Sequence, residues 1–282
     1  MKKEQQYLQD KLLTCYSATE AAAIARWVFE TRFHYSRLDY CLGKDRDFSK
    51  EERDDFENIV CRLLENEPVQ YVLGKTDFCD QKFLVNHHVL IPRPETEELV
   101  RWIASDLSPF PAAPRILDLG TGSGCIAISL SSLLSQAVIS ACDISEDALD
   151  IARKNARNQN VAVSFFQEDI LHPHHLLSGA VWDVWVSNPP YICERERKDM
   201  SCNVLDYEPS TALFVPDEDP LLFYRAIARL GLKGLCPGGF LYFEINRAYG
   251  ELTRQMLEEM GYQEIQVRQD QFGNDRMIKC RR

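Results

Sequence analysis

The chain has 282 residues, 45% of them hydrophobic and 27% charged, a composition typical of a soluble globular protein with more than one domain. Its 43 acidic residues outnumber 32 basic ones, and the net charge of −11 disfavours a protein whose surface is built to bind nucleic acid. The N-terminal lysines precede no apolar run, no stretch is long enough to span a membrane, and the 10 cysteines form no C-x-x-C pair, so we expect a cytoplasmic protein with reduced thiols.

The first part of the chain, residues 1–68, is expected to form a small helical bundle. Apolar residues recur at three- and four-residue spacing in 4–16, 18–33 and 49–65. Ser49 and Glu52 form the pattern of a capping box at the start of the third segment. Pro68 is expected to end the helices, and alternating apolar and polar residues in 69–92 then predict a β-hairpin connector.

Strands and helices alternate over residues 93–282, which predicts a parallel, doubly wound α/β domain. A helix begins at Pro94, and a proline-rich joint at 108–114 precedes the first strand. The expected strands are 115–119, 137–143, 162–167, 183–187, 238–245, 264–269 and 276–281. The expected helices between them are 125–134, 146–158, 220–232 and 249–260. A strand near the C-terminus is expected to close the sheet in the antiparallel direction.

A glycine-rich turn follows the first of these strands. It consists of Gly120, Thr121, Gly122, Ser123 and Gly124, and a helix opens directly after it. Glycines at this point allow the backbone to approach a ligand at the carboxyl end of a parallel strand. No lysine follows, which excludes a Walker-type phosphate loop. A glycine triplet alone is a weak indication of a site.

Acidic residues at the ends of the next two strands strengthen that indication. Asp143 ends the second strand, where a carboxylate can accept both hydroxyls of a ribose. Glu168 and Asp169 follow the third strand, where an acid can accept from an adenine amino group and Ile170 can pack on the ring. One such acid alone is more often a solvated carboxylate. Together with the glycine turn, the acids favour a nucleoside-type ligand.

The fourth strand runs directly into a stiff polar tip, Asn188, Pro189, Pro190 and Tyr191. Each proline fixes its own φ, lacks an N–H and biases the preceding residue towards an extended conformation. The tip therefore presents carbonyl acceptors and an aromatic face, which suits a flat group that carries N–H bonds. The alternative is a proline-terminated strand without chemistry.

The glycine turn, the strand-end acids and the Asn-Pro-Pro-Tyr tip together resemble those of class I S-adenosylmethionine-dependent methyltransferases. The resemblance implies a Rossmann-like sheet in which the glycine turn passes the methionine end of the cofactor and Asp143 holds the ribose. Asn-Pro-Pro-Tyr marks members that methylate a planar exocyclic or amide nitrogen. Such a nitrogen is a poor nucleophile because its lone pair is delocalised. If Asn188 Oδ1 and the Pro189 carbonyl each accept one of its N–H bonds, the nitrogen is held facing the methyl group.

Further stretches narrow the resemblance to one family. They are "EPVQYVLG" (67–74), "LIPRPETEELV" (90–100), "YEPSTALF" (207–214) and "FGNDRMI" (272–278). With the helical N-terminal part they resemble the bacterial release-factor glutamine methyltransferases, the HemK-like family, over essentially the whole chain. The resemblance implies a protein-glutamine N5-methyltransferase that modifies the Gln of the Gly-Gly-Gln motif in peptide chain release factors. It also implies that the domain of residues 1–68 docks the release factor and that 93–282 transfers the methyl group.

The resemblance also assigns roles to individual residues. The expected cofactor contacts are Gly120, Thr121, Gly122, Ser123, Gly124, Asp143, Asp169, Ile170 and Asn188. The expected substrate contacts are Asn188, Pro189, Pro190 and Tyr191, of which Asn188, Pro189 and Tyr191 are the catalytic candidates and Tyr191 can stack on the substrate plane. Arg93, Glu95 and Glu208 are expected to shape the pocket. The chain departs from the family at Ile170, often aromatic, and at Asn246, usually glycine, where we expect a local loop change without loss of activity.

Several alternatives remain open from the sequence. His172, His174 and His175 invite a metal site, but closely spaced loop histidines are more often solvated, and no metal is expected. A nucleic-acid amino-methyltransferase or a non-catalytic cofactor-binding module is compatible with parts of the pattern. We expect neither a nucleic-acid nor a membrane partner. The preferred release factor, the extent of the docking surface and the oligomeric state are not determined, with a monomer as the default expectation.

Overall fold

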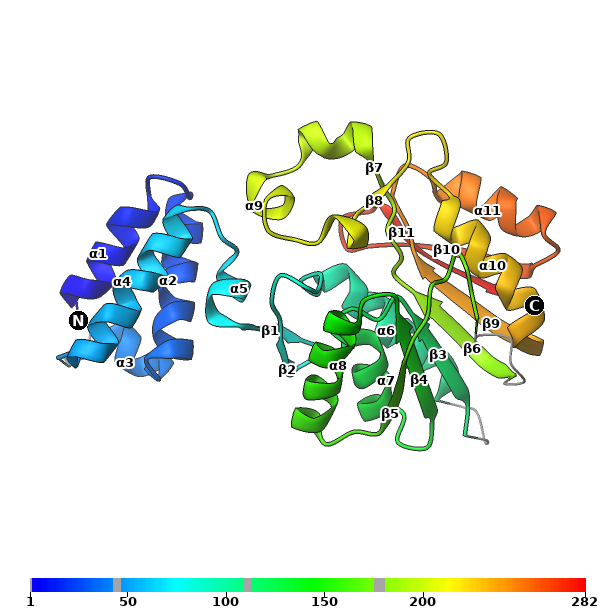
Figure 1. The fold of residues 1–282 in the computed structure, drawn as a ribbon, viewed down its shortest axis with the longest axis horizontal. Helices are drawn as coiled ribbons and strands as arrows, with labels where there is room; N and C mark the ends of the chain where they lie inside the picture. The colour runs from blue at the N-terminus through cyan, green and yellow to red at the C-terminus, as the bar shows by residue number, and fades with distance from the viewer. Residues whose placement is uncertain (1, 43–46, 109–112, 175–180) are drawn as a thin grey trace. The chain divides into compact units, whose positions relative to one another are not determined.

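A computed structural model describes residues 2–42, 47–108, 113–174 and 181–282 (Figure 1). The chain forms two compact units: residues 1–75 with 201–207, and residues 76–200 with 208–282. Among the described residues, no helix combines the length and the apolarity needed to cross a bilayer.

The first unit is helical, as the sequence predicts. Its helices are α1 (Lys2–Leu12), α2 (Ala18–Arg32), α3 (Arg37–Leu42), α4 (Lys50–Leu64) and α5 (Val69–Leu73). The predicted capping box at the start of α4 is confirmed, because Ser49 Oγ accepts from Glu52 N at 3.2 Å and Glu52 Oε2 accepts from Ser49 N at 3.0 Å. The core is aromatic, and Phe33 and Phe48 stack within it at a centroid distance of 4.6 Å.

The segment after α4 differs from the expectation. Pro68 does not end the helical part but occupies the N-cap of α5, and residues 69–73 form a helical turn rather than part of a hairpin. Gly74 ends that turn with a φ of +71°, a left-handed conformation that glycine adopts without strain. The prediction was wrong here because apolar residues in so short a segment fit a single helical turn as well as a strand.

A β-hairpin follows directly. It pairs β1 (Lys75–Phe78) with β2 (Gln81–Leu84). Cys79 and Asp80 connect the strands with φ values of +47° and +61°, and positive φ at both central residues is the signature of a tight type I′ turn. The hairpin is therefore shorter than the predicted range of 69–92.

The second unit contains a seven-stranded sheet in the order β10-β11-β9-β6-β3-β4-β5. The strands are β3 (Arg115–Leu119), β4 (Val138–Asp143), β5 (Val163–Gln167), β6 (Trp182–Ser187), β9 (Leu235–Glu244), β10 (Gln263–Gln269) and β11 (Asp275–Arg281). The five strands from β9 to β5 pair in parallel, whereas β11 pairs antiparallel with both β9 and β10. This confirms the predicted α/β fold with antiparallel closure at the C-terminal edge.

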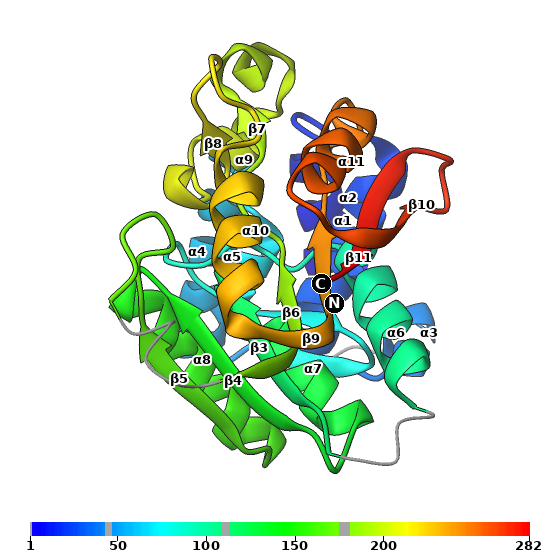
Figure 2. The same cartoon turned by 90° about the vertical axis from the view of Figure 1, so that its right-hand side faces the viewer.

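Helices cover both faces of this sheet (Figure 2). One face packs against α6 (Pro94–Leu107), α7 (Cys125–Leu133) and α8 (Glu146–Gln159), and the other against α10 (Leu222–Gly234) and α11 (Gly250–Glu259). Side chains alternate between these two cores along each strand, so that Ile116 belongs to the first and Leu117 to the second. Two apolar faces explain why the strands read as continuous apolar runs.

The segment between β6 and α10 holds several short elements for which the sequence gives no clear pattern. They are β7 (Ile192–Cys193), the 3₁₀ helix η1 (Glu194–Asp199), α9 (Cys202–Leu205), the 3₁₀ helix η2 (Ser210–Ala212) and β8 (Phe214–Val215). β7 and β8 pair in parallel, with Ile192 opposite Phe214. The two short strands thus bring the ends of this segment together just beyond the Asn-Pro-Pro-Tyr tip.

The connections place a topological switch point between β3 and β6. From β3 the chain winds through α7, β4, α8 and β5 in one direction, whereas β6 pairs with the opposite side of β3. Leu119 and Ser187, the last residues of β3 and β6, lie opposite each other, and Ser187 Oγ donates to the Leu119 carbonyl at 2.6 Å. Open α/β sheets bind ligands outside the carboxyl ends of strands at such a point. The glycine turn and the Asn-Pro-Pro-Tyr tip both emerge there.

Candidate active site

The glycine turn after β3 relies on left-handed backbone conformations. Gly120, Gly122 and Gly124 have φ values of +74°, +55° and +82°. Gly120 N donates to the Cys142 carbonyl at 2.9 Å, which anchors the turn to the neighbouring strand β4. At Gly124 a Cβ atom would lie 2.8 Å from Ile128 Cδ1, so a larger residue would clash as well as strain the backbone. The turn therefore holds a bare backbone at the edge of the sheet.

Asp143, the last residue of β4, lies against this turn. Its Oδ2 accepts from Gly122 N at 2.8 Å and its Oδ1 accepts from Ser145 N at 3.0 Å. Burial raises the pKa of Asp143, and the backbone N–H donors oppose that rise. Each carboxylate oxygen keeps a second lone pair, so the group can still accept hydroxyl donors.

A second acid, Asp118, is fully buried beneath the turn. Its Oδ2 accepts from Thr121 Oγ1 at 2.6 Å, and the backbone N–H of Ala127 also lowers its pKa, whereas no donor in the described residues meets its Oδ1 with full hydrogen-bond geometry. Burial raises the pKa of Asp118 to about 7, with the nearby Asp143 charge acting in the same direction. The hydroxyl of Ser123 is also buried and unpartnered within the described part of the chain. Buried polar atoms without partners are uncommon in native proteins.

The two acids after β5 have different environments. Glu168 is 3% exposed, and its Oε1 accepts from His174 N at 2.7 Å. Asp169 is more exposed, and its Oδ1 accepts from Leu171 N at 2.8 Å. Burial alone would raise the pKa of Asp169, but a hydrogen bond with His172 and backbone donors hold it below its usual value. Ile170, which follows Asp169, is half-buried against the core under α10 and α11.

The histidines that invited a metal site are explained differently. His172 Nδ1 lies 3.0 Å from Asp169 Oδ2, and the backbone of His174 bonds Glu168. His175 lies outside the described residues. Over the described ranges, no group of three or more His, Cys, Asp or Glu residues is placed to hold a metal ion.

Asn188 and Pro189 present two acceptors at the end of β6. Asn188 Nδ2 donates to Thr96 Oγ1 at 3.3 Å, which turns the NH₂ end of the amide towards the protein. No described residue donates to Asn188 Oδ1 or to the Pro189 carbonyl. Asn188 is half-buried and Pro189 is buried. The geometry thus leaves both oxygens available to a ligand that carries N–H bonds.

Tyr191 is half-buried and bonded to a residue that the sequence analysis did not assign. Its hydroxyl donates to Glu244 Oε1 at 3.0 Å, and Thr96 Oγ1 donates to Glu244 Oε2 at 2.5 Å. Burial raises the pKa of Glu244, while the hydrogen bonds from Thr96 and Tyr191 and the charge of Arg276 oppose that rise. Burial, together with the charge of Glu244, raises the pKa of Tyr191, so the phenol stays protonated and donates.

Glu244 and Thr96 are thus site residues that the sequence analysis missed. A signal for Glu244 was present, because it is an acid at the carboxyl end of the apolar run "FLYFEI", and a fully buried acid is rare unless it is paired. Glu244 lies near Asn188 because β6 and β9 are neighbours in the sheet and Ser187 of β6 lies opposite Phe243 of β9. That order is not readable from one sequence.

Two of the family stretches hold each other together. Arg93 Nη2 donates to Glu208 Oε1 at 2.5 Å, and Ile91 N donates to Glu208 Oε2 at 3.3 Å. Glu208 is 5% exposed, so this pairing lies largely out of water. It fixes the start of α6, the helix that carries Thr96. Glu95 is half-buried in the first turn of α6 and takes no part in this ion pair.

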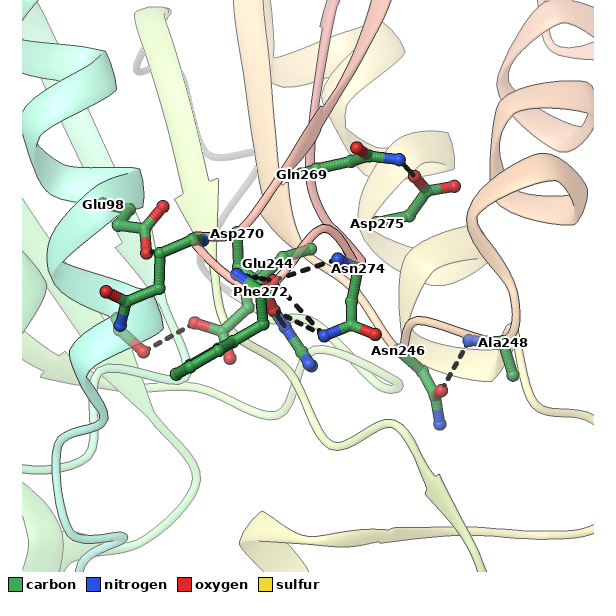
Figure 3. A network of polar contacts seen from close by, with 12 residues as sticks. Glu98, Glu244, Asn246, Ala248, Gln269, Asp270, Phe272, Asn274 and Asp275 are labelled. Carbon is green, nitrogen blue, oxygen red and sulfur yellow. Dashed lines mark hydrogen bonds and ion pairs between the residues drawn. The ribbon is translucent and has the colours of Figure 1, made fainter.

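Asn246 also contacts the Asn-Pro-Pro-Tyr tip. Its Nδ2 donates to the Tyr191 carbonyl at 3.1 Å and lies 3.3 Å from both carboxylate oxygens of Glu196. Its Oδ1 accepts from Ala248 N at 2.9 Å (Figure 3). A glycine at this position would lack these contacts. The departure from the family pattern therefore adds a support for the tip.

The C-terminal hairpin is organised by Asp270 (Figure 3). Its Oδ1 accepts from Phe272 N at 2.9 Å and Asn274 N at 3.0 Å, and its Oδ2 accepts from Arg276 Nε at 3.2 Å. Arg276 in turn acts on the buried Glu244 through its charge. The family stretch 272–278 thus reaches the site through Arg276.

Asn155 of α8, which the sequence analysis did not assign, connects the β1–β2 hairpin with the glycine turn. Its Oδ1 accepts from Leu84 N at 2.7 Å, and its Nδ2 donates to the Leu84 carbonyl at 3.0 Å and to the Ser123 carbonyl at 2.9 Å. The side chain is fully buried. No pattern in the local sequence marks an asparagine for this contact.

Two open hollows lie away from these residues. One of about 450 Å³ borders α8, β4 and β5, and one of about 460 Å³ lies between α10 and α11. Neither is lined by a predicted site residue.

Comparisons with known proteins give consistent results. Residues 97–206 match the family model of the methyltransferase small domain, and residues 6–74 match that of the PrmC N-terminal domain. The chain is 46% identical over 276 residues to a release factor glutamine methyltransferase of Bacteroides thetaiotaomicron, with 98% of each chain covered. It is 41% identical over 270 residues to one of Flavobacterium psychrophilum, with 95% of this chain and 94% of the relative covered. The crystal structure of a methyltransferase from Pyrococcus furiosus, 17% identical, shares the fold with a TM-score of 0.52 over 80% of this chain and 98% of that one.

Proposed function

The chain belongs to the family of release factor glutamine methyltransferases, and from this premise we propose that it transfers a methyl group from S-adenosylmethionine to the side-chain amide of a glutamine in a peptide chain release factor. The glutamine is that of the Gly-Gly-Gln motif. The observation that carries the proposal is the pair of free acceptors, Asn188 Oδ1 and the Pro189 carbonyl, beside the glycine turn at the switch point.

The residues around the glycine turn fit S-adenosylmethionine. Asp143 would accept the ribose hydroxyls, and Asp169 and Ile170 would flank the adenine. The buried Oδ1 of Asp118 places an acid beneath the turn, which suits a ligand that carries positive charge. When bound, the cofactor supplies an electrophilic methyl group on a sulfonium.

The tip residues then address the low reactivity of an amide nitrogen. Asn188 Oδ1 and the Pro189 carbonyl would each accept one N–H bond of the glutamine, which fixes the plane of the amide. As the nitrogen bonds the methyl carbon, the bond from that carbon to the sulfonium sulfur would break and leave a neutral thioether. Positive charge would develop on the nitrogen, which would then release one proton to water. Two acceptors already in place stabilise that charge without reorganisation. The half-buried ring of Tyr191 would stack on the plane of the glutamine amide.

We further propose that different parts of the chain have different roles. Residues 1–68 would dock the release factor, 69–92 would connect, and 93–282 would carry out the transfer. Removal of residues 1–68 should abolish methylation of the intact factor, while S-adenosylmethionine still binds in calorimetry and shows that the remaining part is folded. Unchanged methylation by this truncated chain would remove the docking role.

The function itself is tested with radiolabelled cofactor. The full-length protein is incubated with a release factor, and in parallel with the same factor in which the Gln of Gly-Gly-Gln is replaced by Ala. Label should enter only the first factor, and mass spectrometry should place one methyl group on the glutamine side chain. Equal labelling of both factors, or of neither, would refute the proposed function.

A further inference from the structure

Resting on the proposed function, we infer that Glu244, acting through Thr96, fixes which end of the Asn188 amide faces the substrate, and so makes the site select glutamine over glutamate. Thr96 and Glu244 are positioning residues in this inference, because neither needs to touch the substrate. The inference follows from the donors and acceptors of one hydrogen-bond chain.

This chain runs from β9 through α6 to the tip after β6. Glu244 is 1% exposed and Thr96 is 2% exposed, so water does not compete for their hydrogen bonds. Thr96 Oγ1 lies 2.5 Å from Glu244 Oε2, and Asn188 Nδ2 lies 3.3 Å from Thr96 Oγ1. The second carboxylate oxygen, Glu244 Oε1, accepts a hydrogen bond from the Tyr191 hydroxyl at 3.0 Å.

The direction of every bond in the chain follows from the carboxylate. An ionised carboxylate only accepts, and a threonine hydroxyl has one proton, so Thr96 must donate that proton to Glu244. Only lone pairs of the Thr96 hydroxyl are then left for Asn188, and they require the NH₂ end of the amide. The oxygen end of Asn188 must therefore point away from Thr96.

Burial raises the pKa of Glu244, and three neighbouring groups oppose that rise by stabilising the carboxylate. Two donors, Thr96 and Tyr191, bond its two oxygens, and the positive charge of Arg276 on β11 also lowers its pKa. Glu95 is the acid that opposes them. Arg276 is itself held by Asp270, whose loop is drawn together with Glu244 in Figure 3. The C-terminal hairpin thereby contributes to the orientation of Asn188.

The consequence is a choice between two nearly isosteric side chains. A glutamine amide has N–H bonds to give to Asn188 Oδ1, whereas a glutamate carboxylate has only acceptors and would meet the oxygen with like polarity. A site built to bond an N–H rejects an analogue that lacks it strongly, because its buried acceptor is left unpaired. If the Asn188 amide were rotated by 180°, its NH₂ group would face the substrate and could donate to a glutamate carboxylate.

The test compares Thr96→Val, which has the same shape without the hydroxyl, with Thr96→Ser, which keeps it. Glu244→Gln is a third variant that removes the charge. Each full-length protein is assayed for kcat/KM on the release factor and for inhibition by the factor with Glu in place of the reactive Gln. Thermal unfolding and S-adenosylmethionine affinity report whether each variant is folded. Replacing a buried acid can impair folding, so the comparison of Thr96→Val with Thr96→Ser decides the test.

We expect Thr96→Val to lower kcat/KM by about 10- to 100-fold, with Thr96→Ser within about threefold of the wild type. The Glu-containing factor should inhibit Thr96→Val and Glu244→Gln at least about fivefold more tightly than the wild type, an effect that general loosening would not produce. Wild-type activity and wild-type discrimination in Thr96→Val would overturn the inference, and so would lost activity with unchanged discrimination. Failure of the wild type to methylate the factor would instead refute the proposed function.

Discussion

Asn188 differs from Asp143 and Glu208, two acids of the same unit, in what its side chain leaves free. The oxygens of Asp143 and Glu208 already accept from backbone or side-chain donors, whereas Asn188 Oδ1 accepts from no described residue. An acceptor that no protein group satisfies is available to a ligand that brings the donor. Asn188 is therefore the residue whose removal should affect turnover more than stability.

Replacing Asn188 with alanine removes one of the two preorganised acceptors. We expect turnover on the release factor to fall by about 10²–10³, as for loss of one polar group that stabilises developing charge. Cofactor affinity, measured by calorimetry, should change much less. The matched control is Asn158→Ala, on the exposed side of α8, which should retain wild-type turnover. A wild-type rate in Asn188→Ala would take this residue out of the mechanism.

Asp118 makes the stability of the cofactor-free protein depend on pH. Its folded-state pKa is about 7 instead of 3.8, so between these values the folded state binds a proton that the unfolded state has lost. The contribution is fully present below the unfolded pKa and is lost as the pH rises through the folded pKa. At most about 4 kcal/mol is at stake, because one pKa unit corresponds to about 1.4 kcal/mol.

Asp118→Asn removes this titration. Its free energy of unfolding minus that of the wild type, measured in urea, should increase from pH 4 to pH 7 and level off above. Asp54→Asn, at an exposed position in α4, is the control for replacing a carboxyl group by an amide. A flat difference for Asp118→Asn would show that Asp118 is ionised throughout and finds a partner in solution.

At the level of the elements, one face of α8 contacts both the β1–β2 hairpin and the glycine turn. Asn155 and Gln159 both reach the β1–β2 hairpin, but only the fully buried Asn155 also bonds the glycine turn. The half-buried Gln159 donates to the Lys82 carbonyl at 2.7 Å. The two residues therefore form a matched pair, in the same helix and against the same hairpin, with different burial.

Asn155→Ala should lower the free energy of unfolding by about 3 kcal/mol, because it leaves buried backbone groups of Leu84 and Ser123 without partners. It should also weaken S-adenosylmethionine binding, since Ser123 belongs to the glycine turn. Gln159→Ala should cost less than about 1 kcal/mol and leave cofactor affinity unchanged. Urea unfolding and calorimetry measure both effects. Equal losses for the two variants would show that Asn155 supports the hairpin alone.

The elements also show which features a single sequence reveals. The capping box at Ser49, the start of α6 at Pro94 and the glycine turn were predicted correctly, because each depends on residues close together in the chain. The helical turn at 69–73 was missed because a short apolar segment has no decisive period. The hydrogen bonds that link Glu244, Thr96 and Asn188 could not be predicted, because they join three elements whose proximity is set by the strand order.

The charge of the whole molecule bears on the rival function, methylation of a nucleic-acid base. The chain has 43 acidic and 32 basic residues. Several arginines are already engaged by acids, in the pairs Arg32–Asp55, Arg62–Glu67, Arg93–Glu208, Arg225–Asp219 and Arg276–Asp270. A nucleic-acid substrate needs unpaired cations that displace counterions from its phosphates. The balance of charge therefore favours a protein substrate.

Salt dependence separates the two substrates quantitatively. A protein that neutralises 6–10 phosphates loses about 10³–10⁵ in affinity between 50 and 200 mM salt. We expect kcat/KM for the release factor to change by less than about tenfold over this range, because neither partner carries a polyphosphate backbone. In the same assay, duplex DNA and structured RNA should take up no label from the cofactor. Labelled nucleic acid whose formation falls steeply with salt would favour the base methyltransferase instead, since the Asn-Pro-Pro-Tyr tip can hold an exocyclic amino group as well as a carboxamide.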